Sequence, residues 1–270
     1  DSFTAVVVRE NGLPVIQVLK KNAEKQPLRV VPDDADYSLG LGVNAEFKTD
    51  SLVYWASSMV RPFTTAAFSV TTGQRSTLKV EPVPGYDVTK YDTSRLMVKA
   101  RDGVFVPVSI AFKKGLNLQS ENPLYLEGYG AYGSVYDSMF DQRRVSMLDR
   151  GVVLAFAHIR GGGEFGKPWH DQGRMEHKQT TFDDFVDCAQ WLIAQKYTSP
   201  EKLAITGASA GGLLMGAVLN QHPELFKAAL VEVPFVDVIN TMLDETLPLT
   251  VGEFEEWGNP KVKAEFERMV

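Results

Sequence analysis

Ser209 is the residue whose neighbours most directly indicate chemistry. It lies in the segment 207–211 (GASAG), which fits the pattern G-x-S-x-G, the sharp strand-to-helix turn that presents a nucleophilic serine. Residues 203–206 have the composition of a short buried strand, and residues 212–219 that of an apolar helix. Glycines leave room around a serine with a strained backbone, and a helix that begins there directs backbone N–H groups at developing negative charge. The segment therefore predicts a serine nucleophile.

A serine nucleophile needs a general base and a carboxylate that orients the base. In α/β-hydrolases these partners follow the serine along the chain. His222 is the only histidine after Ser209, and it lies at the far end of the helix that begins at the serine, so it is predicted to be a surface residue. The three histidines before the serine are predicted to be structural or exposed: His158, His170 and His177. We therefore expect either that this chain is a fragment without its general base or that Ser209 is not part of a triad.

Two glycine-rich segments follow apolar strands. Segment 128–133 (GYGAYG) comes after a strand at 124–126, where α/β-hydrolases place an oxyanion donor; a glycine–tyrosine turn is the alternative. Segment 158–164 (HIRGGGE) ends a longer apolar run. It lacks the spacing of phosphate-binding loops, so it is predicted to be a tight loop in which Arg160 makes a structural ion pair.

Acidic and aromatic residues alternate in segment 252–257 (GEFEEW). In an extended or turn-like segment, Glu253 and Glu255 would face the same way. Two carboxylates at the bottom of an apolar pocket would bind a guanidinium or ammonium group and repel acidic side chains. The alternative is the start of a solvated acidic helix.

Secondary-structure elements must position these segments, and the predicted elements differ before and after about residue 80. The first part contains short predicted strands separated by turn residues, at 5–8, 15–19, 52–56 and 66–70. This pattern is typical of propeller blades or of part of a sandwich. Segment 81–85 (EPVPG) is predicted to be a linker, and a hairpin at 95–112 follows it.

Beyond the hairpin, apolar strands alternate with helical patterns. The strands are expected at 124–126, 152–157, 203–206 and 228–231, and a helix at 182–196. This alternation predicts a mainly parallel, doubly wound α/β sheet. Its ligand should lie at the carboxyl ends of the strands, where Ser209 is expected.

Composition limits the class of protein. The chain has 270 residues, of which 44% are hydrophobic and 23% charged, and its net charge is −6. This is typical of a globular protein and argues against a nucleic-acid partner, and no apolar run reaches the roughly 18 residues of a membrane span. The single cysteine, Cys188, is predicted to be a small core residue and suits a reducing compartment. The chain starts at Asp1 with neither an initiator methionine nor a signal peptide. We expect a cytoplasmic protein.

Several segments together resemble the prolyl oligopeptidase family of serine peptidases: 57–62 (SSMVRP), 160–166 (RGGGEFG), 207–214 (GASAGGLL) and 233–238 (VPFVDV). Segments 241–244 (TMLD) and 248–260 (PLTVGEFEEWGNP) point more narrowly to oligopeptidase B. The resemblance runs from about residue 52 to residue 260. It implies an α/β-hydrolase fold, incomplete in this chain, preceded by all-β blades of a partial β-propeller. The corresponding domains are residues 1–80 and 81–270.

The resemblance also implies roles for individual residues. Ser209 is the nucleophile, and Tyr129 and the backbone N–H of Ala210 form the oxyanion hole. Tyr132 lines the substrate pocket. Glu253 and Glu255 match the acidic residues that select Arg or Lys before the cleaved bond. The implied activity is hydrolysis of short basic peptides through an acyl-enzyme, without metal or organic cofactor.

The segments that carry the family's catalytic Asp and His are absent from these 270 residues, as is most of the propeller. We therefore expect this polypeptide to be inactive, or nearly so, by itself. We also expect it to expose surface that further strands would cover, with poor stability or association as the result. Two alternatives stay open: an esterase or lipase of the same fold, and a protein that binds basic peptides without cutting them. The sequence does not reveal the oligomeric state.

Overall fold

The computed structural model describes residues 3–21 and 26–269, which form two compact units. The first comprises residues up to 95, 111–115 and 137–150, and the second comprises residues 96–110, 116–136 and 151–270. Each unit is described by itself.

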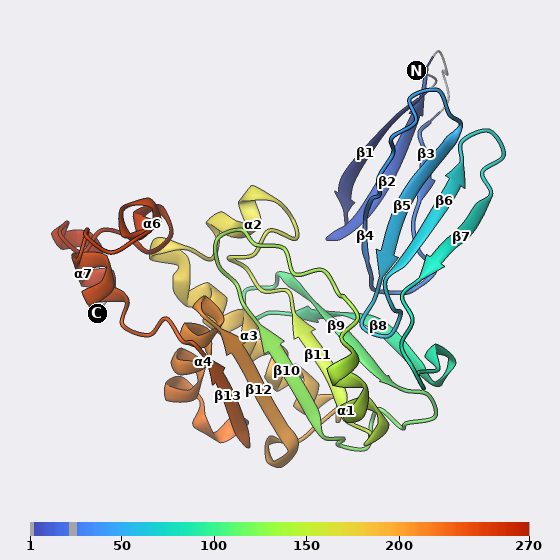
Figure 1. The fold of residues 1–270 in the computed structure, drawn as a ribbon. Helices are drawn as coiled ribbons and strands as arrows, with labels where there is room; N and C mark the ends of the chain where they lie inside the picture. Colours follow the sequence, from blue (N-terminus) through green and yellow to red (C-terminus); the bar gives the residue numbers. More distant parts are fainter. Residues whose placement is uncertain (1–2, 22–25, 270) are drawn as a thin grey trace. The chain divides into compact units, whose positions relative to one another are not determined.

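The first unit contains two antiparallel sheets (Figure 1). One has three strands, β1 (Phe3–Glu10), β2 (Leu13–Lys20) and β3 (Leu28–Val30). The other has four strands in sequence order, β4 (Ser38–Leu41), β5 (Ser51–Ser57), β6 (Thr64–Ser69) and β7 (Arg75–Val80). Side chains from both sheets share one hydrophobic core, which includes Ile16, Val18, Leu39, Leu52 and Phe68. The all-β character expected for the first 80 residues is therefore confirmed.

Three of these strands, β3, β4 and β7, were not expected from the sequence. All six residues of β7 are exposed, so the strand shows no alternation of buried and exposed positions. Strand β4 contains Gly40, where a side chain would collide with the ring of Trp55. Strands β3 and β4 do bury side chains, but with three and four residues they are too short to show a clear alternation. The first unit also contains α1 (Val145–Asp149) and two short 3₁₀ turns, η1 (Val88–Lys90) and η2 (Gln142–Arg144).

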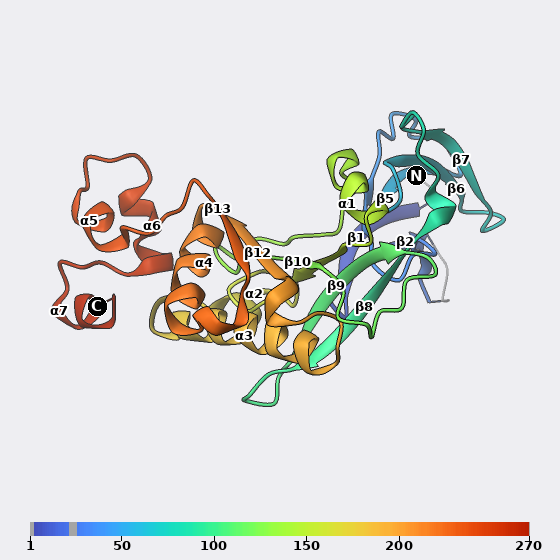
Figure 2. The same ribbon diagram turned by 90° about the horizontal axis from the view of Figure 1, so that it is seen from below.

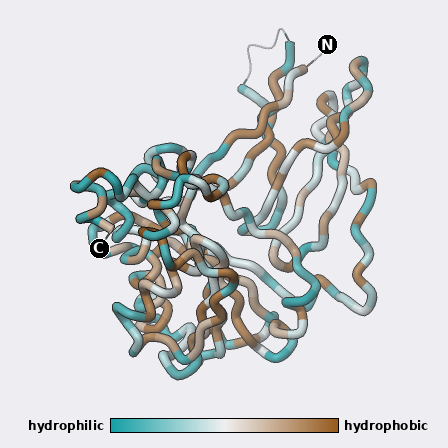
Figure 3. Tube along the Cα trace, turned by 60° about the vertical axis from the view of Figure 1, so that its left-hand side comes forward, coloured by the Kyte–Doolittle hydropathy of each residue, from teal (hydrophilic) through white to brown (hydrophobic). Residues whose placement is uncertain are grey.

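The second unit holds most of a six-stranded sheet with the order β13-β12-β10-β11-β9-β8, of which β8 and β9 each include residues assigned to the first unit. Its strands are β8 (Tyr91–Lys99), β9 (Phe105–Lys113), β10 (Leu124–Gly128), β11 (Val153–Ala157), β12 (Leu203–Ala208) and β13 (Ala228–Glu232). The last four are parallel to one another, as predicted. Every residue of β11 is buried, in agreement with its continuous apolar run. Figure 3 shows hydrophobic residues running along the strands.

The helices of the second unit complete an α/β arrangement. They are α2 (Lys167–Asp171), α3 (Lys178–Ala194), α4 (Ala210–Gln221), α5 (Val238–Leu243), α6 (Thr250–Trp257) and α7 (Lys263–Met269), with 3₁₀ turns η3 (Met175–His177), η4 (Pro200–Lys202) and η5 (Pro223–Leu225). Helix α4 packs on β12 and against α3. Figure 2 shows α5, α6 and α7 grouped at one end of the unit, beyond α4 and β13.

The strand order creates a switch point at β10. The chain passes from β10 to β11 on one side and then crosses to β12 on the other side. In open α/β sheets ligands bind beside the carboxyl ends of the strands at such a point. Tyr129 follows β10 and Ser209 follows β12, so the fold brings these two residues together there.

Candidate active site

Ser209 sits in the turn between β12 and α4 with φ 56° and ψ −117°. A positive φ is uncommon for a residue other than glycine and indicates local strain. Backbone hydrogen bonds to the residues at and after the end of β13 hold Ser209 in place. Its N–H donates to the carbonyl of Glu232 (3.0 Å), and its carbonyl accepts the N–H of Phe235 (3.0 Å). The predicted sharp turn is therefore present, with the serine at its apex.

The glycines around Ser209 have the steric role that the sequence suggested. A Cβ at Gly207 would lie 2.3 Å from the carbonyl oxygen of Gly211, and one at Gly211 would lie 2.8 Å from that of Gly128. A Cβ at Gly212 would lie 2.5 Å from the Cα of Pro234. Backbone occupies the space that these side chains would need, so the turn tolerates only glycine at the three positions.

Two hydrogen-bond donors lie beside Ser209. The Tyr129 ring packs beside Ala210 and Gly211, next to Ser209. Burial raises the pKa of Tyr129, and the neighbouring Ser209 side chain opposes that rise, so the phenol keeps its proton at neutral pH. Ala210 is the first residue of α4, where a backbone N–H has no acceptor within the helix. The pair could stabilise an oxyanion formed next to Ser209.

Aromatic rings surround Tyr129. Its ring centroid lies 4.9 Å from that of Tyr136 and 6.4 Å from that of Tyr132. Tyr132 in turn meets Trp257 edge-on, and its hydroxyl accepts the indole N–H at 3.1 Å. Burial raises the pKa of Tyr132 well above its usual range. Tyr132 thus links the segment after β10 to helix α6.

The acidic segment forms helix α6, so the expectation of an extended segment with Glu253 and Glu255 on one side is wrong. Residues two apart in a helix point about 200° away from each other. Glu255 is exposed, whereas Glu253 is partly buried. Burial is the main cause of the raised pKa of Tyr132, and the charge of Glu253 adds to it. For Tyr129, burial and the charge of Glu256 raise the pKa more than the charge of Glu253 does. Glu253 and Glu256, but not Glu255, are therefore near enough for their charges to act on both tyrosines.

Glu256 is a residue that the sequence analysis missed. It is only 5% exposed. One carboxylate oxygen accepts the backbone N–H of Tyr132 (2.9 Å), and the other lies 2.6 Å from Nε2 of His170. The signal that could have found it is helical spacing, because residues 253, 256 and 257 share one face of a helix.

In the described part of the chain, each of the four histidines either contacts another side chain or is exposed. His158 is buried and 2.6 Å from Ser109, and His170 contacts Glu256. His177 is exposed at the start of α3. His222 caps the end of α4 and contacts Glu224 at 3.2 Å. The prediction that they are structural or exposed agrees with these positions.

Ser109, His158 and Glu164 form a second serine–histidine–carboxylate chain, with 3.5 Å between Nδ1 of His158 and Glu164. All three residues are buried. A nucleophile must reach substrate, so this arrangement does not offer a second reaction centre; it fixes the segment after β11.

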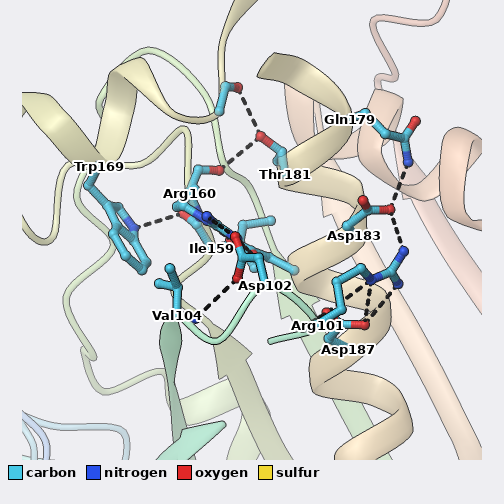
Figure 4. Close-up of polar contacts among 12 residues, drawn as sticks. Arg101, Asp102, Val104, Ile159, Arg160, Trp169, Gln179, Thr181, Asp183 and Asp187 are labelled. Carbon is cyan, nitrogen blue, oxygen red and sulfur yellow. Dashed lines mark hydrogen bonds and ion pairs between the residues drawn. The ribbon is translucent and has the colours of Figure 1, made fainter. Parts of the chain in front are cut away.

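Arg160 makes the predicted structural ion pair (Figure 4). Its guanidinium donates to Asp184 at 2.6 and 2.9 Å and to Asp102 at 2.6 Å. Arg160 and Asp184 are both buried. The contacts join the hairpin turn at Asp102 and helix α3 to the segment after β11. Cys188, also on α3, is buried as expected, and burial raises the pKa of its thiol.

Within residues 3–21 and 26–269, no three His, Cys, Asp or Glu side chains gather as a metal ion would require. In that same part of the chain, no helix combines the length and apolar character needed to cross a membrane.

Comparison with known proteins gives consistent results. A profile of the Prolyl oligopeptidase family matches residues 138–270. Dipeptidyl aminopeptidase BI of Pseudoxanthomonas mexicana is 44% identical over 99% of this chain, and Protease 2 of Moraxella lacunata is 40% identical over 96%. The chain spans 37% of the length of each of these curated relatives. The structure of oligopeptidase B from Leishmania major superposes with a TM-score of 0.89 at 37% identity, covering 99% of this chain and 39% of that one.

Proposed function

The chain belongs to the prolyl oligopeptidase family, and from this premise we propose that it is part of a serine oligopeptidase that cleaves short peptides after Arg or Lys. The α/β sheet of the second unit is that of an α/β-hydrolase. The observation that carries the proposal is the position of Ser209 at the apex of a strained strand-to-helix turn, with the Tyr129 ring packed beside Ala210 and Gly211. This arrangement places a nucleophile beside a neutral donor at the point where an oxyanion would form.

The reaction follows from this geometry. The hydroxyl oxygen of Ser209 forms a bond to the carbonyl carbon of the peptide, while a histidine outside residues 1–270 takes its proton. The Tyr129 hydroxyl and the Ala210 N–H donate to the resulting oxyanion. The C–N bond then breaks, the amine leaves with the proton from the histidine, and an acyl-enzyme remains. Water hydrolyses the acyl-enzyme by the same steps and releases the carboxylic acid product.

The basic specificity is assigned mainly to Glu253. Its charge acts on Tyr129 and Tyr132, whereas Glu255 is exposed and its backbone carbonyl accepts a bond from Arg174 (2.6 Å). A carboxylate in partly buried surroundings binds a guanidinium more strongly than one in water. Tyr132 supplies an aromatic wall for the alkyl part of the basic side chain.

We further propose that residues 1–80 are the last part of a β-propeller domain and that residues 81–270 are the first part of the catalytic domain. Four antiparallel strands in sequence order, as in β4 to β7, are the arrangement of a propeller blade.

The test is steady-state hydrolysis of fluorogenic peptides by the longest gene product that contains residues 1–270. Substrates carry Arg, Lys, Phe or Pro before the scissile bond, each with a free or a blocked amino terminus. We expect a strong preference for Arg and Lys. Cleavage of free termini alone would indicate release of dipeptides, as the name of the relative from Pseudoxanthomonas mexicana suggests for that protein. Hydrolysis of simple esters without any peptide cleavage would support the esterase alternative instead.

Substituting Glu253→Gln in that protein should lower kcat/KM for Arg substrates by about 30-fold, or ~2 kcal/mol, the scale of losing one partner of a desolvated ion pair. Glu255→Gln is the matched substitution on the exposed side of the same helix and should have a much smaller effect. Phe substrates should be affected little by either. An equal loss for Arg and Phe substrates in Glu253→Gln would contradict the assignment.

A further inference from the structure

We propose that Glu256 is a positioning residue that holds the tyrosine loop, residues 129–133, in the conformation that places Tyr129 against Ser209. The inference rests on the proposed function, because it assigns Glu256 a role in that same reaction. Both carboxylate oxygens of Glu256 already have partners within the protein, the Tyr132 N–H and His170. The residue is therefore occupied with structure rather than with substrate, in contrast to Glu253.

The tyrosine loop needs external support because its backbone is strained. Tyr132 has φ 60°, and the neighbouring Gly130 and Gly133 have φ 68° and 60°. Glycine adopts such values readily, but tyrosine does so only where the surroundings enforce them. The hydrogen bond from the Tyr132 N–H to Glu256 acts directly on that strained residue.

Lys178 and Trp257 support the same loop from the same side. Nζ of Lys178 donates to the carbonyl of Gly130 at 2.6 Å and to that of Gly173 at 3.2 Å. The ammonium also lies 5.0 Å from the ring centroid of Trp257, whose indole N–H donates to the Tyr132 hydroxyl. Burial lowers the pKa of Lys178 to about 8, and the charge of Glu256 opposes that shift. Glu256 thus stabilises the loop by a direct bond and by favouring the charged form of Lys178.

One consequence concerns the link between catalysis and specificity. Glu253 lies three residues before Glu256 on α6, and positions three apart share a helix face. The contact that fixes the tyrosine loop therefore also fixes the distance between that loop and Glu253. Loss of Glu256 should impair every substrate, since all of them use Tyr129, whereas loss of Glu253 should impair basic substrates alone.

The experiment is a double-mutant cycle in the longest gene product that contains residues 1–270. We expect Glu256→Ala to lower kcat at least tenfold for Arg and Phe substrates alike, and to slow labelling of Ser209 by a fluorophosphonate to a similar degree. In a Tyr129→Phe background, the same substitution should lower kcat by less than about threefold, because the donor that it positions is already gone. Glu267→Ala removes an exposed carboxylate of α7 and is the matched control.

The outcomes separate the two proposals. An equal loss from Glu256→Ala in both backgrounds, or no loss in either, overturns the positioning role while wild-type labelling and cleavage still support the peptidase. A wild-type protein that is neither labelled nor active on peptides overturns the proposed function and this inference with it. If Glu256→Ala does not fold, Glu256→Gln is assayed by itself, outside the cycle. Its amide oxygen can still accept the Tyr132 N–H, so it should retain most of the activity, and a loss as large as that of Tyr129→Phe contradicts the role.

Discussion

At the scale of single residues, Ser209 and Tyr129 define the reaction centre. The serine is held at positive φ by backbone bonds to Glu232 at the end of β13 and to Phe235 after it, and the tyrosine directly follows β10. Neither residue carries a charge, so catalysis must depend on how accurately the two side chains are placed. The Tyr129 ring packs beside Ala210 and Gly211, so this placement exists before substrate binds.

Removal of the Tyr129 hydroxyl tests this view. We expect Tyr129→Phe to lower kcat by about 10²–10³-fold, the range measured for loss of one oxyanion donor, with little change in KM. The phenyl ring keeps the contacts with Tyr132 and Tyr136, so thermal stability should be nearly unchanged. Stopped-flow or steady-state kinetics beside a melting curve provides the measurement, and a tenfold rise in KM at constant kcat would show that the hydroxyl binds substrate instead.

At the scale of elements, the turn between β12 and α4 could be predicted from the sequence, whereas helix α6 could not. The turn has a recognisable sequence because only glycine fits the close backbone contacts at Gly207, Gly211 and Gly212. Helix α6 was harder to predict. Glu253-Phe254-Glu255 alternates with period two, the pattern of a strand, yet the structure places Glu256 and Trp257 on the buried face of a helix. Which of three nearby glutamates is buried depends on the helical phase, which packing on the tyrosine loop decides.

Two glycine substitutions separate these cases. Gly207→Ala introduces a Cβ that would lie 2.3 Å from a backbone oxygen, and it should destabilise the protein by about 3 kcal/mol. Gly252→Ala, within α6, meets nothing within 4 Å and should stabilise the helix by about 0.5–1 kcal/mol. Denaturant unfolding of both variants measures the difference. Similar midpoints for the two would mean that the turn relaxes more easily than its contacts indicate.

At the scale of the molecule, the parallel α/β sheet could be predicted, whereas three strands of the first unit could not. The continuous apolar run of β11 and the alternation of strands and helices led to the parallel sheet that is observed. Exposed strands such as β7 lack that signal. The carboxylate partner of Arg160 could not be identified from the sequence either, since Asp184 lies 24 residues away on another element.

The edge of the parallel sheet leads to a prediction about association. Strand β13 is the outermost strand next to β12, and all five of its residues are exposed. Leu230 is 51% and Val231 37% exposed, and an exposed apolar edge pairs readily with other chains. A polypeptide of residues 1–270 should therefore self-associate, and Leu230→Lys should reduce that association. Size-exclusion chromatography with light scattering measures both, and a wild-type monomer at high concentration would disprove the prediction.

The most direct test of the central claim is covalent trapping of the longest gene product that contains residues 1–270. The reagents are peptidyl phosphonates that end in Arg or in Phe, and mass spectrometry of a digest locates the adduct. The account predicts an adduct on Ser209 that forms much faster with the Arg reagent, and no adduct in Ser209→Ala. An adduct on another residue, or equal rates for the two reagents, would contradict it.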